Sequence, residues 1–272
     1  MKIQFFCPRW GSEDVPYAQF FEKVKQAGYD GVEMPLPLEA KEKEEIVEHL
    51  DRNGLLLIGQ HWECTLSGSD TYEVDYERYL RNLAETNPLF INSQIGKDYF
   101  SFEHNVDILK LADHIAKDTG VAIVHETHRG KFSYAIGEIT AYLSSLPDLT
   151  LCADLSHWCA VSESLLEWPE QKVILEETVK RVSHIHARVG WQQSAQVSDP
   201  RAPEFAEALN SHLNWWDMIV EARKQVNSST LTITPEFGPH PYMPSLPYVQ
   251  QPLANQWKTN VYMMNLLRER YP

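Results

Sequence analysis

The chain has 272 residues, of which 43% are hydrophobic and 23% charged, and this composition is typical of a globular enzyme rather than a disordered chain. Its formal net charge of -14 argues against binding along a nucleic-acid backbone, which depends on Lys and Arg contacts to phosphates. No run approaches the roughly 18 apolar residues of a membrane helix, and no secretory signal pattern is visible. We therefore expect a cytoplasmic protein with no nucleic-acid or membrane partner.

Short β-rich runs alternate with longer amphipathic stretches along the whole chain. In chain order, we expect strands at 2–6, 31–34, 55–60, 89–94, 121–126, 149–154, 182–186 and 231–234. The helices expected between and after them are at 15–29, 39–53, 70–86, 101–120, 133–146, 162–180 and 204–226, and a last helix carries Trp257, Val261, Met264 and Leu267. Gly54 and Gly120 are typical helix stops, and Ser101 is a typical helix N-cap.

Eight strands that are each followed by a helix predict one (β/α)₈ TIM barrel, with residues 1–272 forming a single domain. The strands are almost continuously apolar because parallel strands are buried on both faces. A doubly wound open sheet is the alternative, but no Gly-rich phosphate loop follows any of the strands. The cysteines Cys7, Cys64, Cys152 and Cys159 lack metal-finger spacing, which predicts reduced thiols.

Polar residues stand at the ends of four successive strands, where a barrel of this kind carries its chemistry. Glu126 ends the fifth expected strand, Asp154 the sixth with His157 three residues later, His186 the seventh, and Glu236 follows the eighth. Each could be explained singly by an ion pair, a helix cap or a buried hydrogen bond. Packed together, they would repel or lose solvation without a cation. Their oxygen and nitrogen atoms suit a divalent metal ion.

This order of residues resembles the xylose isomerase-like barrel superfamily, which contains sugar isomerases and epimerases and the endonuclease IV group. Two further motifs are similar to the same superfamily: Ala-Gly-Tyr-Asp-Gly-Val-Glu at 27–33 and Ile-Asn-Ser-Gln-Ile-Gly at 91–96. The resemblance covers the whole chain. The set of polar residues from four strands is much more specific than the early Gly motif.

Within the superfamily, the chain resembles the ketose 3-epimerase branch. The resemblance implies that Glu126, Asp154, His186 and Glu236 bind one divalent ion, which could be Mn, Co, Zn or Mg. It also implies that Glu126 and Glu236 act as acid and base on opposite faces of the substrate. The expected function is a metal-dependent isomerase or epimerase that abstracts a proton next to the metal-bound carbonyl of a small ketose or polyhydroxy ketone.

The expected partner is a small sugar or polyol. The same resemblance makes His157 and Arg188 substrate contacts, with Arg201 as a competing candidate for the second. Other residues that follow strands could wall a pocket for such a molecule. These are Trp10, His61, Gln94 and His128 as the expected substrate contacts, with Phe6, Glu33 and Trp62 beside them.

Three alternatives remain at this stage. A dehydratase or lyase acting on an inosose-like or keto-sugar substrate would need the same metal and carboxylates. An endonuclease IV-like nuclease would need extra histidines, yet the chain has only His61 on the third strand and carries Gln94 on the fourth. A noncatalytic sugar-binding protein would tolerate loss of the metal set. A homo-oligomer is compatible with all of these readings.

Overall fold

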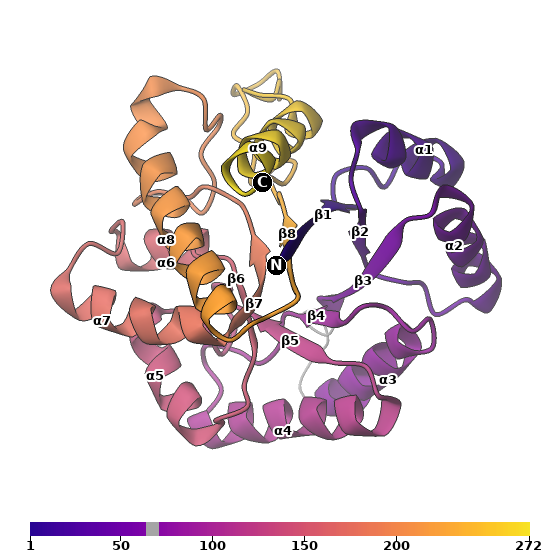
Figure 1. The fold of residues 1–272 in the computed structure, drawn as a ribbon, viewed down its shortest axis with the longest axis horizontal. Coiled ribbons are helices and arrows are strands. Elements are labelled where there is room, and N and C mark those ends of the chain that lie inside the picture. Colours follow the sequence, from indigo (N-terminus) through magenta and orange to yellow (C-terminus); the bar gives the residue numbers. More distant parts are fainter. Residues whose placement is uncertain (64–70) are drawn as a thin grey trace.

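The computed structural model describes residues 1–63 and 71–272. Strands β1 to β8 pair in parallel in sequence order and close into a barrel through the pairing of β8 with β1. The strands are Lys2–Pro8 (β1), Gly31–Met34 (β2), Leu56–His61 (β3), Ile91–Ser93 (β4), Ile123–Glu126 (β5), Leu151–Ala153 (β6), Val182–His186 (β7) and Thr230–Thr234 (β8). Figure 1 shows the strands in the middle of the molecule and the helices around them. The predicted (β/α)₈ TIM barrel is confirmed.

The helices cover the outside of the barrel. They are Tyr17–Ala27 (α1), Ala40–Asn53 (α2), Tyr72–Ala84 (α3), Phe102–Thr119 (α4), Ile136–Ser145 (α5), Ser156–Ser162 (α6), Pro169–Thr178 (α7), Ala206–Gln225 (α8) and Gln256–Arg270 (α9), with short 3₁₀ turns Val179–Arg181 (η3) and Pro203–Phe205 (η4). No helix in the described part of the chain is both long and apolar enough to cross a membrane.

The helix predicted at 162–180, with its main helical part starting near Pro169, is partly confirmed. Residue 162 is the last residue of a separate short helix, α6, and the longer helix, α7, begins only at Pro169. Glu163 ends α6 with a left-handed φ of 47°, and Pro169 is the first residue of α7, where its missing N–H costs no helix hydrogen bond. The helix predicted at 70–86 is α3; its expected first residue and Cys64 lie outside the described residues.

The predicted helix ends at Ser101 and Gly120 are confirmed on either side of α4. The Ser101 hydroxyl oxygen accepts a hydrogen bond from the backbone N–H of His104, and Gly120 follows the helix at a φ of 73°. A side chain would be strained at that φ, so glycine lets the chain turn back toward β5. Local signals of this kind set where each helix returns the chain to the barrel.

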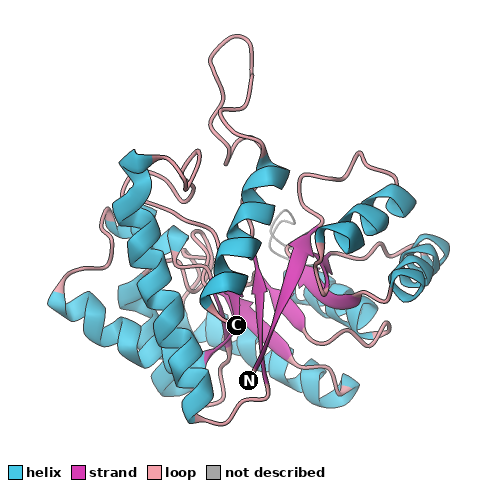
Figure 2. Cartoon of the chain, turned by 45° about the horizontal axis from the view of Figure 1, so that its top comes forward, coloured by secondary structure: helices cyan, strands magenta, loops and turns pink. Residues whose placement is uncertain are grey.

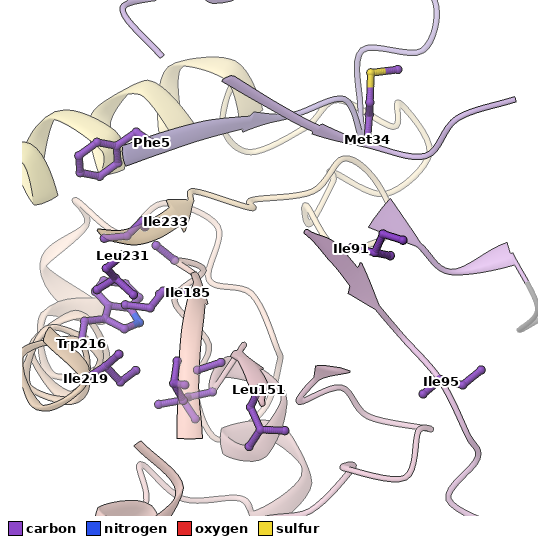
Figure 3. Packing of buried hydrophobic residues seen from close by; sticks show 14 of the residues in the cluster. Phe5, Met34, Ile91, Ile95, Leu151, Ile185, Trp216, Ile219, Leu231 and Ile233 are labelled. Atoms are coloured by element: carbon purple, nitrogen blue, oxygen red, sulfur yellow. The ribbon is translucent and has the colours of Figure 1, made fainter. Parts of the chain in front are cut away.

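The core between the barrel and its helices is apolar. On one side, Ile185 of β7 and Leu231 and Ile233 of β8 face Trp216 and Ile219 of α8, and all five side chains are buried (Figure 3). Alternate residues of a strand point to opposite faces. The neighbours of Ile185 in sequence, His184 and His186, therefore point into the barrel, where the polar residues collect.

Gly31 at the start of β2 has no room for a side chain, because a Cβ would lie 2.4 Å from the carbonyl oxygen of Leu56 and 2.4 Å from the ring of Phe6. We expect Gly31→Ala to lower the free energy of unfolding by about 2–3 kcal/mol, as overpacking does. Gly137 in α5 is the control, since a Cβ at that position would meet no described atom within 4 Å. Gly137→Ala should raise that free energy by about 0.5–1 kcal/mol. Urea unfolding measures both; equal effects would contradict the packing argument.

The last helix is tied to α8 by a charged cluster. Arg270 donates two hydrogen bonds to the Asp217 carboxylate, at 2.8 and 2.5 Å, and the Tyr271 hydroxyl donates a third at 2.8 Å. The hydrogen bond from Arg270 lowers the pKa of Asp217 below its usual 3.8; burial opposes this shift, and the hydrogen bond from Tyr271 adds to it. The cluster therefore stabilises the fold while Asp217 is ionised.

Because the pKa of Asp217 is lower in the folded chain, its contribution is present above pH 3.8 and is lost as the pH falls through the folded-state pKa. We expect Asp217→Asn to reduce the free energy of unfolding at pH 7 by up to about 1 kcal/mol, since the cluster is partly exposed. The difference from the wild type should shrink when denaturant unfolding is repeated at lower pH. A difference that stays constant with pH would assign the effect to packing instead.

Candidate metal centre

Four polar side chains converge at the carboxyl ends of β5 to β8. Glu126 ends β5, Asp154 follows β6, His186 ends β7 and Glu236 follows β8. Each offers one potential ligand atom, and these atoms all lie within 4.8 Å of one another. Three of the side chains are completely buried and Glu236 is 2% exposed. The structure thus brings together the four residues that the sequence predicted as metal ligands.

His186 presents its two ring nitrogens to different carboxylates. Its Nδ1 lies 2.9 Å from Oε2 of Glu236 and 3.5 Å from Oε2 of Glu126, while its Nε2 lies 2.9 Å from Oε1 of Glu33. Burial alone would lower the pKa of His186, but the surrounding acidic groups raise it well above its usual value. The imidazole therefore sits in a strongly negative environment, with Nδ1 turned toward the cluster.

Glu33 of β2 is the hydrogen-bond acceptor beneath the cluster. Besides contacting His186, its carboxylate lies 3.1 Å from His184 Nε2 and accepts hydrogen bonds from Thr234 Oγ1 at 2.5 Å and Asn92 Nδ2 at 2.9 Å. Burial would raise the pKa of Glu33, but the two imidazoles lower it well below its usual value. Glu33 is completely buried. Its expected place in a pocket wall was therefore wrong, because the barrel interior encloses it.

Arg188 is paired with Asp154. Its Nη2 donates to Oδ2 of Asp154 and, at 2.7 Å, to Nε2 of His157, and its Nε donates to the hydroxyl of Ser156. The ring of Tyr242 covers the guanidinium, with 4.7 Å between Cζ and the ring centroid. Burial would lower the pKa of Arg188, but Asp154 raises it, so the group is cationic. Arg188 thus fixes the orientation of one proposed ligand.

The donor set fits a divalent cation. Oε1 of Glu126 and Nδ1 of His186 are enclosed, and neither forms a hydrogen bond among the described residues, although Nδ1 lies 2.9 Å from Oε2 of Glu236. Unsatisfied buried polar atoms are costly, and a cation would satisfy both of these. Burial also raises the pKa of Asp154, even though Arg188 opposes this shift. Three carboxylates and one imidazole could hold Mn²⁺, Co²⁺, Zn²⁺ or Mg²⁺.

Two further histidines lie beside the cluster. The rings of His128 and His157 are 3.9 Å apart between centroids, and each has a ring nitrogen within 4.8 Å of a carboxylate oxygen of Glu126. Burial lowers the pKa of His128 to about 4 and that of His157 well below its usual value, so both rings are neutral. Because Arg188 donates to Nε2 of His157, the ring proton is assigned to Nδ1. That nitrogen has no partner in the described structure.

A cavity of about 300 Å³, called the mouth cavity below, opens beside the cluster. Its lining contains the predicted residues Trp10, Trp62, Gln94, His128, Arg188 and Glu236, and in addition Arg9, Gln60 and Tyr242. Gln94 donates to Oε2 of Glu126 at 3.0 Å, and Gln60 donates to Oε1 of Glu236 at 3.0 Å. Each of the two glutamates is therefore held by a glutamine, Glu126 by one that follows the neighbouring strand β4 and Glu236 by one from β3.

Three of the residues considered as substrate contacts do not line the mouth cavity: His61, His157 and Arg201. His61 is completely buried at the end of β3, packs against Tyr76 with 5.0 Å between ring centroids, and does not line the mouth cavity. Burial lowers its pKa to about 3. Arg201, the competitor of Arg188, forms an exposed ion pair with Asp199. The predicted contact of His61 with substrate has no geometric support here, because packing encloses its ring.

The sequence reasoning missed several residues of the site. His184 could have been found, because it precedes His186 by two residues on the same strand and must point the same way. Asn92 stands inside a buried strand, where a polar side chain signals a partner. Tyr242 lies in a Pro-rich loop whose sequence gave no such signal.

The hydrogen bond from His186 to Glu33 should set the metal affinity. We expect Glu33→Gln to weaken Mn²⁺ binding by about 10–100-fold, as loss of a residue that orients a metal-binding histidine does. Isothermal titration calorimetry measures this affinity directly. Glu44→Gln, on the exposed face of α2, is the matched control. Unchanged Mn²⁺ affinity in a folded Glu33→Gln variant would show that Glu33 has only a structural role.

Comparison with known proteins gives a family and a set of similar folds. The sequence model of the xylose isomerase-like TIM barrel family matches residues 21–201. No curated protein matches the chain.

Solved structures resemble the chain at low sequence identity. The probable 3-DHS dehydratase AsbF from Bacillus anthracis is 15% identical with a TM-score of 0.64, covering 99% of this chain and 100% of its own. A xylose isomerase-like TIM barrel protein from Mycobacterium smegmatis, in complex with magnesium, is 11% identical with a TM-score of 0.62, covering 99% and 98%. A D-tagatose 3-epimerase-like protein is 13% identical with a TM-score of 0.58, covering 98% and 96%. These similarities show that the chain shares the fold of these proteins.

Proposed function

We propose that this chain, which belongs to the xylose isomerase-like TIM barrel family, is a divalent-metal-dependent isomerase or epimerase of a small polyhydroxy ketone. The observation that carries the proposal is the buried set of Glu126, Asp154, His186 and Glu236 beside the mouth cavity. The solved structures with a similar fold include a D-tagatose 3-epimerase-like protein and a probable 3-DHS dehydratase, which supports an enzyme of one of these two kinds.

A bound divalent ion would polarise the carbonyl of the substrate and make the neighbouring C–H group more acidic. Glu126 and Glu236 approach the cluster from β5 and β8. In the proposed reaction one of these carboxylates takes the proton from carbon, and the other supplies a proton to the opposite face, which inverts that carbon. Return of the proton to the adjacent carbon would give isomerisation instead.

The glutamines in the cavity wall support this assignment. Gln94 and Gln60 each donate a hydrogen bond to one oxygen of Glu126 and Glu236, respectively. A carboxylate held at one oxygen keeps a fixed orientation for its other oxygen. The two acid/base groups are therefore positioned by the barrel rather than by the substrate alone. Aromatic side chains of Trp10 and Tyr242, 5.0 Å apart between ring centroids, would cover the apolar side of a sugar.

A dehydratase is the second candidate, and the His128–His157 pair favours it. In an elimination, a carboxylate that has taken the proton from carbon can pass it to the departing hydroxyl group, and a nearby hydrogen-bond donor would orient that group. The assigned Nδ1–H of His157 is a donor without a partner in the described structure, next to the proposed ligands. A keto-sugar whose hydroxyl group reached this nitrogen could lose water instead of being epimerised.

Deuterium exchange tests the proposed reaction. In D₂O with Mn²⁺, we expect a panel of ketoses to include one that gains deuterium at the carbon beside its carbonyl, detected by NMR. Glu236→Gln should reduce the rate of exchange by about 10²–10⁴-fold, because a general acid/base group is lost. Glu44→Gln should leave it unchanged.

The other outcomes separate the candidates. Formation of an unsaturated product would favour the dehydratase, and conversion without exchange would indicate hydride transfer. Wild-type protein that binds no divalent ion, or alanine variants at the four ligands that bind it as tightly as the wild type, would overturn the proposed site.

A further inference from the structure

Arg9 is a buried cation at the end of the barrel that carries the candidate centre. It follows β1 directly, and its side chain is only 7% exposed. The guanidinium lies over the rings of Phe20 and Tyr17, with 4.5 and 5.0 Å from Cζ to their centroids. Its Nη2 donates to the backbone carbonyls of Glu13 at 3.1 Å and Val15 at 2.8 Å. These contacts hold the group in place without neutralising its charge.

No acidic group among the described residues forms an ion pair with Arg9, and its Nη1 has no hydrogen-bond partner there. The nearest acid in sequence, Glu13, has both carboxylate oxygens engaged by the backbone N–H of Gly11, at 2.9 and 3.0 Å. Buried charges are normally paired, since an unpaired one loses its hydration without compensation. Arg9 therefore has no direct ion pair among the described residues, although Glu13 lines the same cavities.

Arg188 provides the contrast within the same cavity. Both guanidinium groups line the mouth cavity and both are buried. Arg188 contacts the carboxylate of Asp154 and lies 3.7 Å from that of Glu236, so its charge is already balanced by the proposed ligands. Of the two guanidinium groups in the cavity wall, Arg9 is therefore the one without an ion pair among the described residues.

The position of Arg9 also fits contact with a bound molecule. It lies in the wall between the mouth cavity and a neighbouring cavity of about 430 Å³, and the two cavities share Arg9, Glu13 and Pro35. Glu236, one of the proposed ligands, lines the mouth cavity as well. A molecule that reached the cluster with one end would extend along this cavity toward the guanidinium.

We infer that Arg9 binds an anionic group of the substrate, so that the substrate is an acidic derivative of a polyhydroxy ketone. The identity of this substrate as a ketone rests on the proposed function. The anionic group is a carboxylate or a phosphate, both of which match the planar donor edge of a guanidinium. It stands at the end of the molecule remote from the carbonyl. Arg9 is the counter-ion that selects it.

Three six-carbon probes that differ only at C6 test the inference: D-fructose, D-fructuronate and D-fructose 6-phosphate. Calorimetry on the full chain, with and without Mn²⁺, measures their dissociation constants. We expect at least one of the two anions to bind about tenfold or more tightly than fructose, the scale of a charged hydrogen bond. The anion that binds more tightly identifies the charged group of the substrate as a carboxylate or a phosphate. The preference should weaken as NaCl rises, because salt screens the contact.

Three variants test whether Arg9 causes the tighter binding of the anionic probes. Arg9→Met keeps an unbranched apolar stem between Phe20 and Tyr17, and should bring the ratio of anion to fructose affinity close to one. Arg9→Lys keeps the charge and should retain part of the preference, which covers the case in which Arg9→Met fails to fold. Arg201→Met removes an exposed arginine outside the mouth cavity and should leave the ratio unchanged. Circular dichroism and Mn²⁺ affinity report whether each variant is intact.

The inference is overturned if neither anion binds, if the wild type binds all three probes equally, or if folded Arg9→Met keeps the preference. These outcomes are distinct from failure of the proposed function. The latter is decided by Mn²⁺ binding and deuterium exchange, whereas the anion preference can be measured in protein without metal.

Discussion

The buried carboxylate of Glu33 is the contact on which the candidate centre depends. It sits inside the barrel and links β2 to β4, β7 and β8 through Asn92, His184, His186 and Thr234. A carboxylate buried in this way is tolerated only with its hydrogen bonds complete. Glu33 engages Nε2 of His186 and leaves Nδ1 directed at the cluster of carboxylates. The orientation of the imidazole is therefore set before a metal ion or substrate binds.

Charge balance explains the arrangement above Glu33. The acidic side chains at the strand ends are buried close together, and the guanidinium of Arg188 is a cationic group that lies beside two of them. A divalent ion would add positive charge where Glu126 and His186 each have an unsatisfied atom. Arg188 then keeps Asp154 oriented, and Tyr242 shields the guanidinium from solvent. The proposed metal site and its arginine are therefore parts of one electrostatic unit.

The fold and the four converging residues could be predicted from sequence because both follow from short-range patterns. Apolar runs alternating with amphipathic stretches predict the barrel, and in a barrel the residues that end successive strands must meet. The role of Glu33 could not be predicted this way, since its partner His186 is 153 residues away. The short helix α6 was missed because seven residues are too few for a clear helical period.

The proposed metal ligands and the residue proposed to bind the anion come from different strands of the barrel. The proposed ligands come from β5 to β8, whereas Arg9 and Gln60, which line the cavity, come from the ends of β1 and β3. Long protruding loops such as the one before α9 (Figure 2) add Tyr242 to the same opening. Because Glu33 and Gln60, on the same side as Arg9, hold His186 and Glu236 in place, an attempt to change which molecules are accepted would have to be confined to Arg9 and its neighbours at the end of β1.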